Sequence, residues 1–207
     1  MRNASISFYF GLGSRYSYLA STQLDRIEAE VGCTFEWLPL ATGTLISRAN
    51  KGRNPFHEDP NSGQYDWTFR EKDAMAWADY YDVPFREPVS FRTDPEDLAK
   101  ACWFADRSGL LKAMCRKVFE AIFVDGEVVT RPLLAEMAHG LGLDAQQMID
   151  ALDSTALAEK HEQILERALS DGAFGSPTFI VNGQLFWGND RLPLVVHAVK
   201  KLQAGGL

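Results

Sequence analysis

The sequence contains little cysteine, and its cysteines form no redox motif. Cys33, Cys102 and Cys115 are odd in number, and none stands in a Cys-x-x-Cys pair. This pattern argues against a disulfide framework and favours a reducing, cytoplasmic location. The four histidines share no metal-ligand spacing, so we expect no metal site. Gly11-Leu-Gly13 lacks the third glycine of a phosphate-binding GxGxxG loop.

Long apolar runs and an excess of positive charge are also missing. No run reaches the roughly 18–20 residues that span a bilayer, and the N-terminus lacks the continuous apolar stretch of a signal peptide. The formal net charge is −7, which argues against nucleic acid or an anionic membrane as the default partner. With 207 residues, 46% of them hydrophobic, the chain has the size and composition of a soluble globular domain, with or without an insertion.

Two short apolar runs near the C-terminus predict a β-hairpin. Thr178–Val181 and Gln184–Trp187 flank an Asn-Gly pair, the preferred pair for a type I′ turn. Ser176-Pro177 precedes the first run, and proline is tolerated at the first residue of a strand. After the hairpin, Asp190 offers a helix cap before an apolar helix at Leu192–Leu202.

The first 40 residues predict a strand, a helix and a second strand. Ile6–Phe10 alternates apolar and polar residues, Tyr18–Val31 has apolar residues at helical spacing, and Phe35–Pro39 is the second strand. With the hairpin and the last helix, the order is βαβ–ββα, an α/β, thioredoxin-like fold. In this topology Ser14, at the start of the first helix, should meet Ser176-Pro177 at one edge of the sheet.

The middle of the chain is helical and too long to be a loop. We interpret residues 41–170 as an all-helical domain inserted into a thioredoxin-like domain made of residues 1–40 and 171–207. The predicted helices of the insertion are Tyr65–Tyr81, Pro95–Arg107, Leu110–Phe123, Pro132–Leu141, Asp144–Leu152 and Thr155–Leu169.

Ser14 is the first candidate for chemistry. The start of a helix favours an anion, and a hydroxyl there can donate to a thiolate and lower the pKa of the thiol. The alternative is a plain N-cap. Ser14 and Ser17 occupy the frame in which redox proteins of this fold carry Cys-x-x-Cys. Without sulfur here, dithiol–disulfide exchange is excluded, and any sulfur chemistry needs a thiol from a cofactor.

Three further segments are candidate ligand contacts. Ser176-Pro177 predicts a cis peptide whose preceding backbone groups pair with an extended ligand, or else a plain turn. Asn189 and Asp190 suit an α-amino group, although Asp190 also fits a helix cap or a pair with Arg191. The polar, basic loop Asn50–Pro55 suits a ligand carboxylate, or is a solvated linker.

Both ends of the chain resemble a known family. Phe8-Tyr-Phe-Gly-Leu-Gly-Ser-Arg-Tyr-Ser-Tyr-Leu-Ala20 is similar to the start of the 2-hydroxychromene-2-carboxylate isomerases and the related kappa-class glutathione transferases. Gly172-Ala-Phe-Gly-Ser-Pro-Thr-Phe179 and Phe186-Trp-Gly-Asn-Asp-Arg-Leu192 resemble their C-terminal signature. The likeness covers nearly the whole chain, including the helical insertion of the wider DsbA-type group.

The resemblance implies a glutathione site. Ser14 matches the serine that faces the glutathione sulfur, and Ser176, before Pro177, matches the residue whose backbone pairs with the cysteinyl unit. Asn189 and Asp190 match the γ-glutamyl binders, and Asn54-Pro55 matches the Asn-Pro of the loop after the second strand. The resemblance also implies a homodimer.

The implied reaction interconverts a hydroxychromene carboxylate and a ring-opened benzylidenepyruvate, by addition of the glutathione thiolate, bond rotation and loss of the thiol. It needs an aromatic-lined pocket with a cation, for which the candidates are Arg15, Tyr16, Phe69 and Trp77. Four positions depart from the family: Arg15 replaces a usual proline, Gly11 a common acidic residue, Ser176 the usual valine before the proline, and Ser62 a basic residue often found before the Gly-x-Tyr of the insertion. Arg15 adds a cation beside the expected thiolate, which leaves room for a substrate other than the best-known one.

Three functions therefore compete. The first is a glutathione-dependent isomerase of aromatic catabolism. The second is a glutathione transferase acting on electrophiles, which differs because the sulfur stays on the product. The third is a non-catalytic thiol- or peptide-binding module that uses the cis-proline edge.

Overall fold

Four strands form one mixed sheet in the computed structural model, which describes residues 6–57, 63–88 and 94–205. The strands are β1 (Ile6–Phe10), β2 (Phe35–Pro39), β3 (Thr178–Val181) and β4 (Gln184–Trp187), in the order β2-β1-β3-β4. β1 runs parallel to β2 and antiparallel to β3, and β3 and β4 form the hairpin. The predicted thioredoxin-like topology is confirmed.

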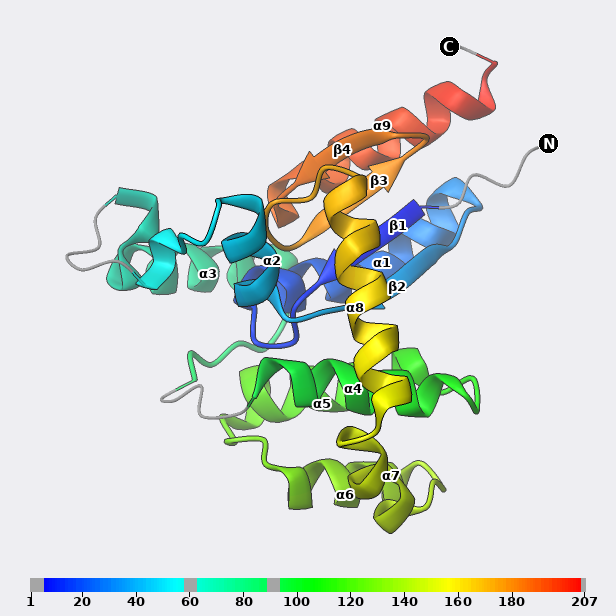
Figure 1. Ribbon diagram of the computed structural model, residues 1–207. Helices are drawn as coiled ribbons and strands as arrows, with labels where there is room; N and C mark the ends of the chain where they lie inside the picture. The colour runs from blue at the N-terminus through cyan, green and yellow to red at the C-terminus, as the bar shows by residue number, and fades with distance from the viewer. Residues whose placement is uncertain (1–5, 58–62, 89–93, 206–207) are drawn as a thin grey trace.

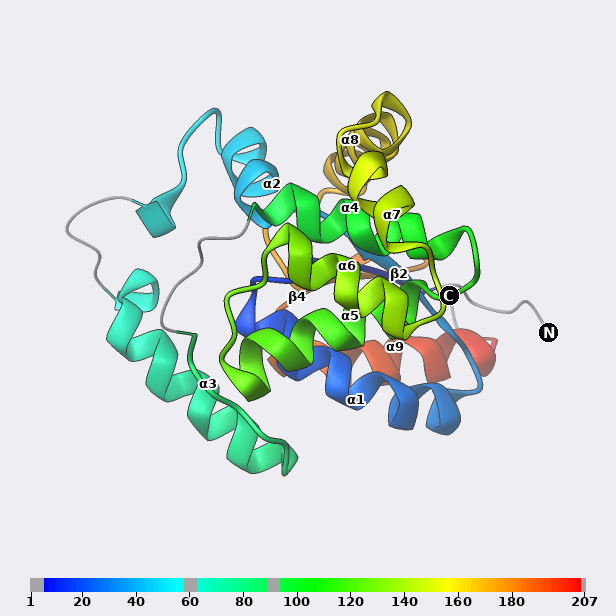
Figure 2. The same cartoon turned by 90° about the horizontal axis from the view of Figure 1, so that it is seen from below.

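Helices cover both faces of this sheet. α1 (Arg15–Val31) and α9 (Leu192–Gln203) lie side by side on one face, and α8 (Thr155–Ser170) crosses the other (Figures 1 and 2). The remaining helices lie between β2 and β3 in the sequence: α2 (Thr42–Ala49), α3 (Trp67–Tyr81), α4 (Pro95–Asp106), α5 (Leu111–Glu120), α6 (Arg131–Gly140) and α7 (Ala145–Leu152). α4 to α7 form a layer below the sheet in Figure 1.

The sheet is held by aromatic packing on one face and polar contacts on the other. The Phe8 ring stacks on Phe10 and Phe179, with centroids 4.4 and 5.0 Å apart, and offset aromatic pairs add to the energy of burial. Tyr9 points to the opposite face, because side chains alternate along a strand. Its hydroxyl donates to Asp171, at the end of α8, over 2.6 Å. β1 is therefore held to β3 by ring stacking and to the end of α8 by a hydrogen bond.

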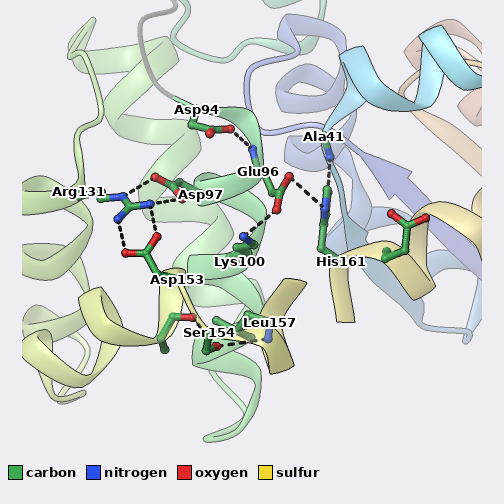
Figure 3. Close-up of polar contacts among 12 residues, drawn as sticks. Ala41, Asp94, Glu96, Asp97, Lys100, Arg131, Asp153, Ser154, Leu157 and His161 are labelled. Carbon is green, nitrogen blue, oxygen red and sulfur yellow. Dashed lines mark hydrogen bonds and ion pairs between the residues drawn. The ribbon is translucent and has the colours of Figure 1, made fainter. Parts of the chain in front are cut away.

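α8 joins the sheet to the layer below it. Its Arg167 pairs with Glu36 of β2 at 2.5 Å, while its other end lies beside α4 and α7. Figure 3 shows the polar contacts of that lower layer, where Arg131 bridges Asp97 and Asp153 at 2.7 and 2.8 Å. Because α8 contacts both parts, the division into residues 1–40 with 171–207 and residues 41–170 stays a prediction.

The structure refines one local prediction and contradicts another. The helix expected over Leu110–Phe123 is α-helical from Leu111 to Glu120, and Ala121–Asp125 then form a π-helical turn that ends at Gly126, whose φ is 73° and whose N–H donates to Ala121 O. Asp190 does not cap α9: it lies in a 3-10 turn, Asn189–Arg191, that runs directly into the helix. Proline in the first turn of α9 removes one of the donors that a cap would satisfy.

A close approach at Gly11 supplies a test of this packing. A Cβ at Gly11 would lie 2.0 Å from Thr42 Oγ1, so Gly11→Ala should destabilise the protein by about 1–3 kcal/mol. The control is Gly43→Ala, whose Cβ would meet nothing closer than 3.8 Å. Urea unfolding of both variants measures the effect, and equal midpoints for Gly11→Ala and the wild type would contradict the close approach.

Candidate functional site

Ser14 lies at the junction of β1 and α1. Its N–H donates to Gly11 O at 3.0 Å, and its Oγ accepts the N–H of Ser17 at 3.3 Å, so Ser14 is the N-cap of α1. A hydroxyl carries one donor and two acceptor sites. Since the cap bond uses an acceptor site, the hydroxyl proton stays available to a ligand, and the two roles of Ser14 are compatible.

Ser17 stands one turn behind Ser14 and is fully buried. Its side chain is 0% exposed, and its Oγ has no hydrogen-bond partner. The position that holds the second cysteine of a redox pair in related folds is therefore filled by an inert hydroxyl. Cys33, Cys102 and Cys115 are free and buried.

The Ser176-Pro177 peptide is cis, as predicted. Pairing of Tyr9 with Thr178 places the end of β1 beside Pro177, so the segments of Ser14 and Ser176 meet at one edge of the sheet, as the topology predicts. Ser176 Oγ lies 2.8 Å from Thr42 Oγ1, at the start of α2. Three segments far apart in the sequence therefore converge here.

The backbone of Ser176 has unused hydrogen-bonding groups. Within the described ranges, no hydrogen bond engages its N–H or its C=O, whereas Pro177 O accepts the N–H of Gly188 at 2.9 Å. Backbone groups at a strand end are strong donors and acceptors. This edge can therefore pair with an extended ligand.

Asn189 presents a second unpartnered group. Its side chain is 3% exposed and its Nδ2 has no partner, although its backbone O accepts the hydroxyl of Tyr81 at 3.2 Å. Asp190 is partly exposed and pairs with Arg191 at 3.2 Å. A buried amide without a partner is costly, so a ligand that accepts from Asn189 would gain binding energy.

Asn54 and Pro55 lie after α2, and Asn54 is at the rim of an open pocket. Asn54 Oδ1 accepts the N–H of Phe56 at 3.1 Å, which fixes the loop. The pocket, of about 720 Å³, is bordered by Asn54 and by Gly43, Ser47 and Arg48 of α2. Arg48 is already paired with Glu162 of α8.

Arg15 and Tyr16 face α3 and the segment that follows it. Arg15 is only 2% exposed, lies 2.5 Å from Glu87 and stacks 4.4 Å from the centre of the Trp67 ring. Burial lowers the pKa of Arg15, and Glu87 opposes that shift. The hydroxyl of Tyr16 donates to Asp73 at 2.8 Å; burial, then this bond, raise the pKa of Tyr16 well above its usual value.

The other two predicted pocket residues lie elsewhere on α3. Phe69 is 54% exposed, and Trp77 packs against Tyr80 and Tyr81 with ring centroids 5.7 and 5.2 Å away. The aromatic ring that the structure brings to Arg15 is instead Trp67. Trp67 was not among the pocket candidates named from the sequence, because only the folded chain brings its ring to Arg15.

His161 of α8 forms a hydrogen bond to the residue that precedes α2. It is 3% exposed, and its Nε2 accepts the N–H of Ala41, just before α2, at 3.0 Å (Figure 3). This bond requires a neutral imidazole, because a protonated Nε2 cannot accept. Burial lowers the pKa of His161, and Lys100 and Arg48 act in the same direction, while Glu96 and Glu162 oppose it.

No cluster of three metal-ligating side chains occurs among residues 6–57, 63–88 and 94–205. Over the same residues, no helix has the length and hydropathy to cross a membrane.

The fold and this edge define a thioredoxin-fold protein in which serines occupy the redox positions. Residues 5–200 match the family described as DSBA-like thioredoxin domain, and the chain belongs to that family.

Relatives and a solved structure extend this comparison over nearly the whole chain. A 2-hydroxychromene-2-carboxylate isomerase of Sphingobium xenophagum is 29% identical over 91% of this chain and 94% of its own. A glutathione S-transferase kappa 2 of Caenorhabditis elegans is 23% identical over 92% and 89%. A crystallised 2-hydroxychromene-2-carboxylate isomerase superposes with a TM-score of 0.83 at 23% identity, covering 96% of this chain and 95% of that one.

His161 generates a pH prediction. Its pKa is lower in the folded protein than the usual value of about 6.5, so the unfolded chain binds a proton first. Stability should therefore fall as pH drops through about 6.5, and His161→Gln, which can still accept from Ala41, should flatten that fall. Urea midpoints measured between neutral and mildly acidic pH test it. His197→Gln changes an exposed histidine and serves as the control; a curve that His161→Gln leaves unchanged would contradict the assignment.

Proposed function

We propose that this protein is a glutathione-dependent isomerase that acts on 2-hydroxychromene-2-carboxylate or a closely related aromatic carboxylate. The proposal depends mainly on the position and bonding of Ser14. Its hydroxyl caps α1 as an acceptor, so the O–H remains available as a donor, and it lies at the edge of the sheet where redox proteins of this fold carry their reactive cysteine. The isomerase from Sphingobium matches 91% of the chain, which supports the same reaction class.

The chain's own residues fit glutathione because several polar groups at this edge lack partners. Ser176 has a free backbone N–H and C=O, Asn189 has a buried, unpartnered Nδ2, and Asp190 carries a carboxylate beside it. We assign the backbone of Ser176, before cis-Pro177, to the cysteinyl unit and Asn189 with Asp190 to the γ-glutamyl end. Asn54 borders the neighbouring pocket, and we propose Asn54 together with Pro55, which follows it in the chain, as further contacts.

When bound, glutathione would supply a thiol that adds to the substrate and leaves again. The Ser14 hydroxyl would donate a hydrogen bond to the sulfur and so stabilise its thiolate form. The positive end of α1 favours the same negative charge. Arg15, with Tyr16, Phe69 and Trp77 as the weaker candidates, would face the substrate. Because the redox positions hold serine, a disulfide exchange at Ser14 and Ser17 is chemically excluded.

A transferase is the second candidate, and the kappa-class relative favours it. The two reactions share the thiolate and differ in the fate of sulfur: the isomerase releases glutathione, while a transferase leaves a stable conjugate. Mass spectrometry of the product separates them. We further propose a cytoplasmic homodimer, which light scattering of the purified protein would test.

The first test of this function is Ser14→Ala. If the Ser14 hydroxyl donates to the thiolate, its removal should lower turnover about 10²-fold or more. If Ser14 is only a helix cap, its removal should cost about 1 kcal/mol of folding stability and leave turnover intact. Ser154→Ala is the matched control, because Ser154 caps α8 through the same bond, Oγ to Leu157 N–H at 3.3 Å. Turnover and thermal unfolding are measured for both. If both variants lose the same stability and Ser14→Ala keeps its turnover, Ser14 acts only as a helix cap.

Asp190→Ala tests the glutathione site without turnover. Removing one charged partner of the γ-glutamyl amino group should weaken glutathione binding about tenfold, as measured by calorimetry. Asp150→Ala, which removes an exposed carboxylate on α7, should leave the affinity unchanged. An unchanged affinity in Asp190→Ala would remove this residue from the site, and absence of binding to the wild type would remove glutathione itself.

A further inference from the structure

Two arginines near Ser14 have buried nitrogen atoms without partners. Arg15, the first residue of α1, leaves Nη1 unpartnered, and Arg70 of α3 leaves Nε unpartnered. Among the described residues, no carboxylate lies within ion-pair distance of Arg70. A buried donor that has no acceptor costs free energy in the free protein, and a ligand that accepts from it recovers that cost.

Aromatic rings hold both guanidinium groups in place. Arg15 lies 4.4 Å from the centre of the Trp67 ring, and Arg70 lies 5.6 Å from the same ring and 4.5 Å from that of Phe56. Both guanidinium groups therefore lie over the ring of Trp67. Phe56 directly follows Asn54-Pro55, so these contacts run from the proposed glutathione loop to the residue beside Ser14.

Glu87 is a poorly bonded counter-ion for this pair. Its Oε1 lies 2.5 Å from Arg15 Nη2, yet both of its carboxylate oxygens are buried and neither forms a hydrogen bond of normal geometry. Burial raises the pKa of Glu87; Glu71 acts in the same direction, and Arg15 and Arg70 act against it. A ligand carboxylate that forms hydrogen bonds of better geometry with Arg15 can therefore replace Glu87 in this ion pair.

The position of Arg15 itself argues for an anion. The first turn of a helix is its positive end, where a cation is unfavourable and an anion is stabilised. A second cation nearby makes the arrangement worse: burial first, and then Arg15, lowers the pKa of Arg70. Glu87 alone leaves donors on both arginines unused, so the cluster has donors for an additional carboxylate.

We propose that Arg15 and Arg70 form the subsite for the substrate's carboxylate, with Trp67 stacking on its planar conjugated part and Glu87 as the resident counter-ion that the carboxylate displaces. This assignment rests on the proposed function for the identity of the substrate. Two arginine forks match the two oxygens of a carboxylate, and guanidinium groups stacked on an indole present a flat surface to a planar anion. Arg70 and Glu87 thus join Arg15 as residues that select the substrate's charge.

The displacement predicts opposite effects for variants of one cluster. Calorimetric binding of 2-hydroxybenzoate should weaken about ten- to a hundredfold in Arg70→Gln, because a charged hydrogen bond is lost. In Glu87→Gln, which keeps the shape and removes the competing charge, binding should tighten about tenfold. The neutral amide, 2-hydroxybenzamide, should bind the wild type at least tenfold more weakly than the anion. Arg107→Gln, an arginine near the ring of Phe104 on α4, is the matched control and should bind as the wild type does.

Each contrary result overturns the subsite. No binding of millimolar 2-hydroxybenzoate, equal binding of the amide, unchanged binding in Arg70→Gln or weaker binding in Glu87→Gln would each do so. Arg70→Gln could instead weaken the binding of glutathione and leave the binding of 2-hydroxybenzoate unchanged. The subsite would then bind a carboxylate of glutathione, and the assignment to the substrate would fail. The anion titrations are run without glutathione, so anion binding that depends on Arg70 together with no glutathione binding would uphold the subsite and reject the proposed function.

Discussion

The pairing of β1 with two distant strands is the constraint on which the rest of the structure depends. β1 lies between β2, which follows it closely in the sequence, and β3, which comes only after all the helices of the insertion. The end of this one strand therefore brings Ser14, Thr42 and Ser176 to the same edge. Segments that are far apart in the sequence form a site only because β1 pairs with both β2 and β3, and the buried aromatic stack at Phe8 stabilises that pairing.

The strands could be predicted from the sequence because each carries a strong local signal. The Asn182-Gly183 turn has φ values of 48° and 81°, the left-handed conformation that this pair favours, and it fixes the register of β3 and β4. The expected Asp190 cap failed because the 3-10 turn that contains Asp190 continues directly into α9, so the residue before the helix is Arg191. α2 was not distinguished within the insertion, because its N-cap is Ala41, which makes no side-chain cap bond.

The site could be predicted only in part, because burial and partners depend on tertiary packing. Ser14 and the cis proline follow from topology and turn chemistry. Arg15 was named from the sequence as a pocket cation, but its burial beneath Trp67 and beside Glu87 depends on how α3 and the segment after it pack. Arg70 carries no sequence signal at all: it becomes noticeable only when its unpartnered nitrogen and its neighbours in space are known.

The close approach of Thr42 to Gly11 also has an evolutionary consequence. Thr42 Oγ1 occupies the space that a side chain at position 11 would need, and it is held there by Ser176. A larger residue at position 11 is therefore acceptable only after position 42 becomes smaller or turns away, which releases Ser176 as well. Positions 11, 42 and 176 should change together among descendants of this protein, and a lineage that restored an acidic residue at position 11 would have to rebuild all three.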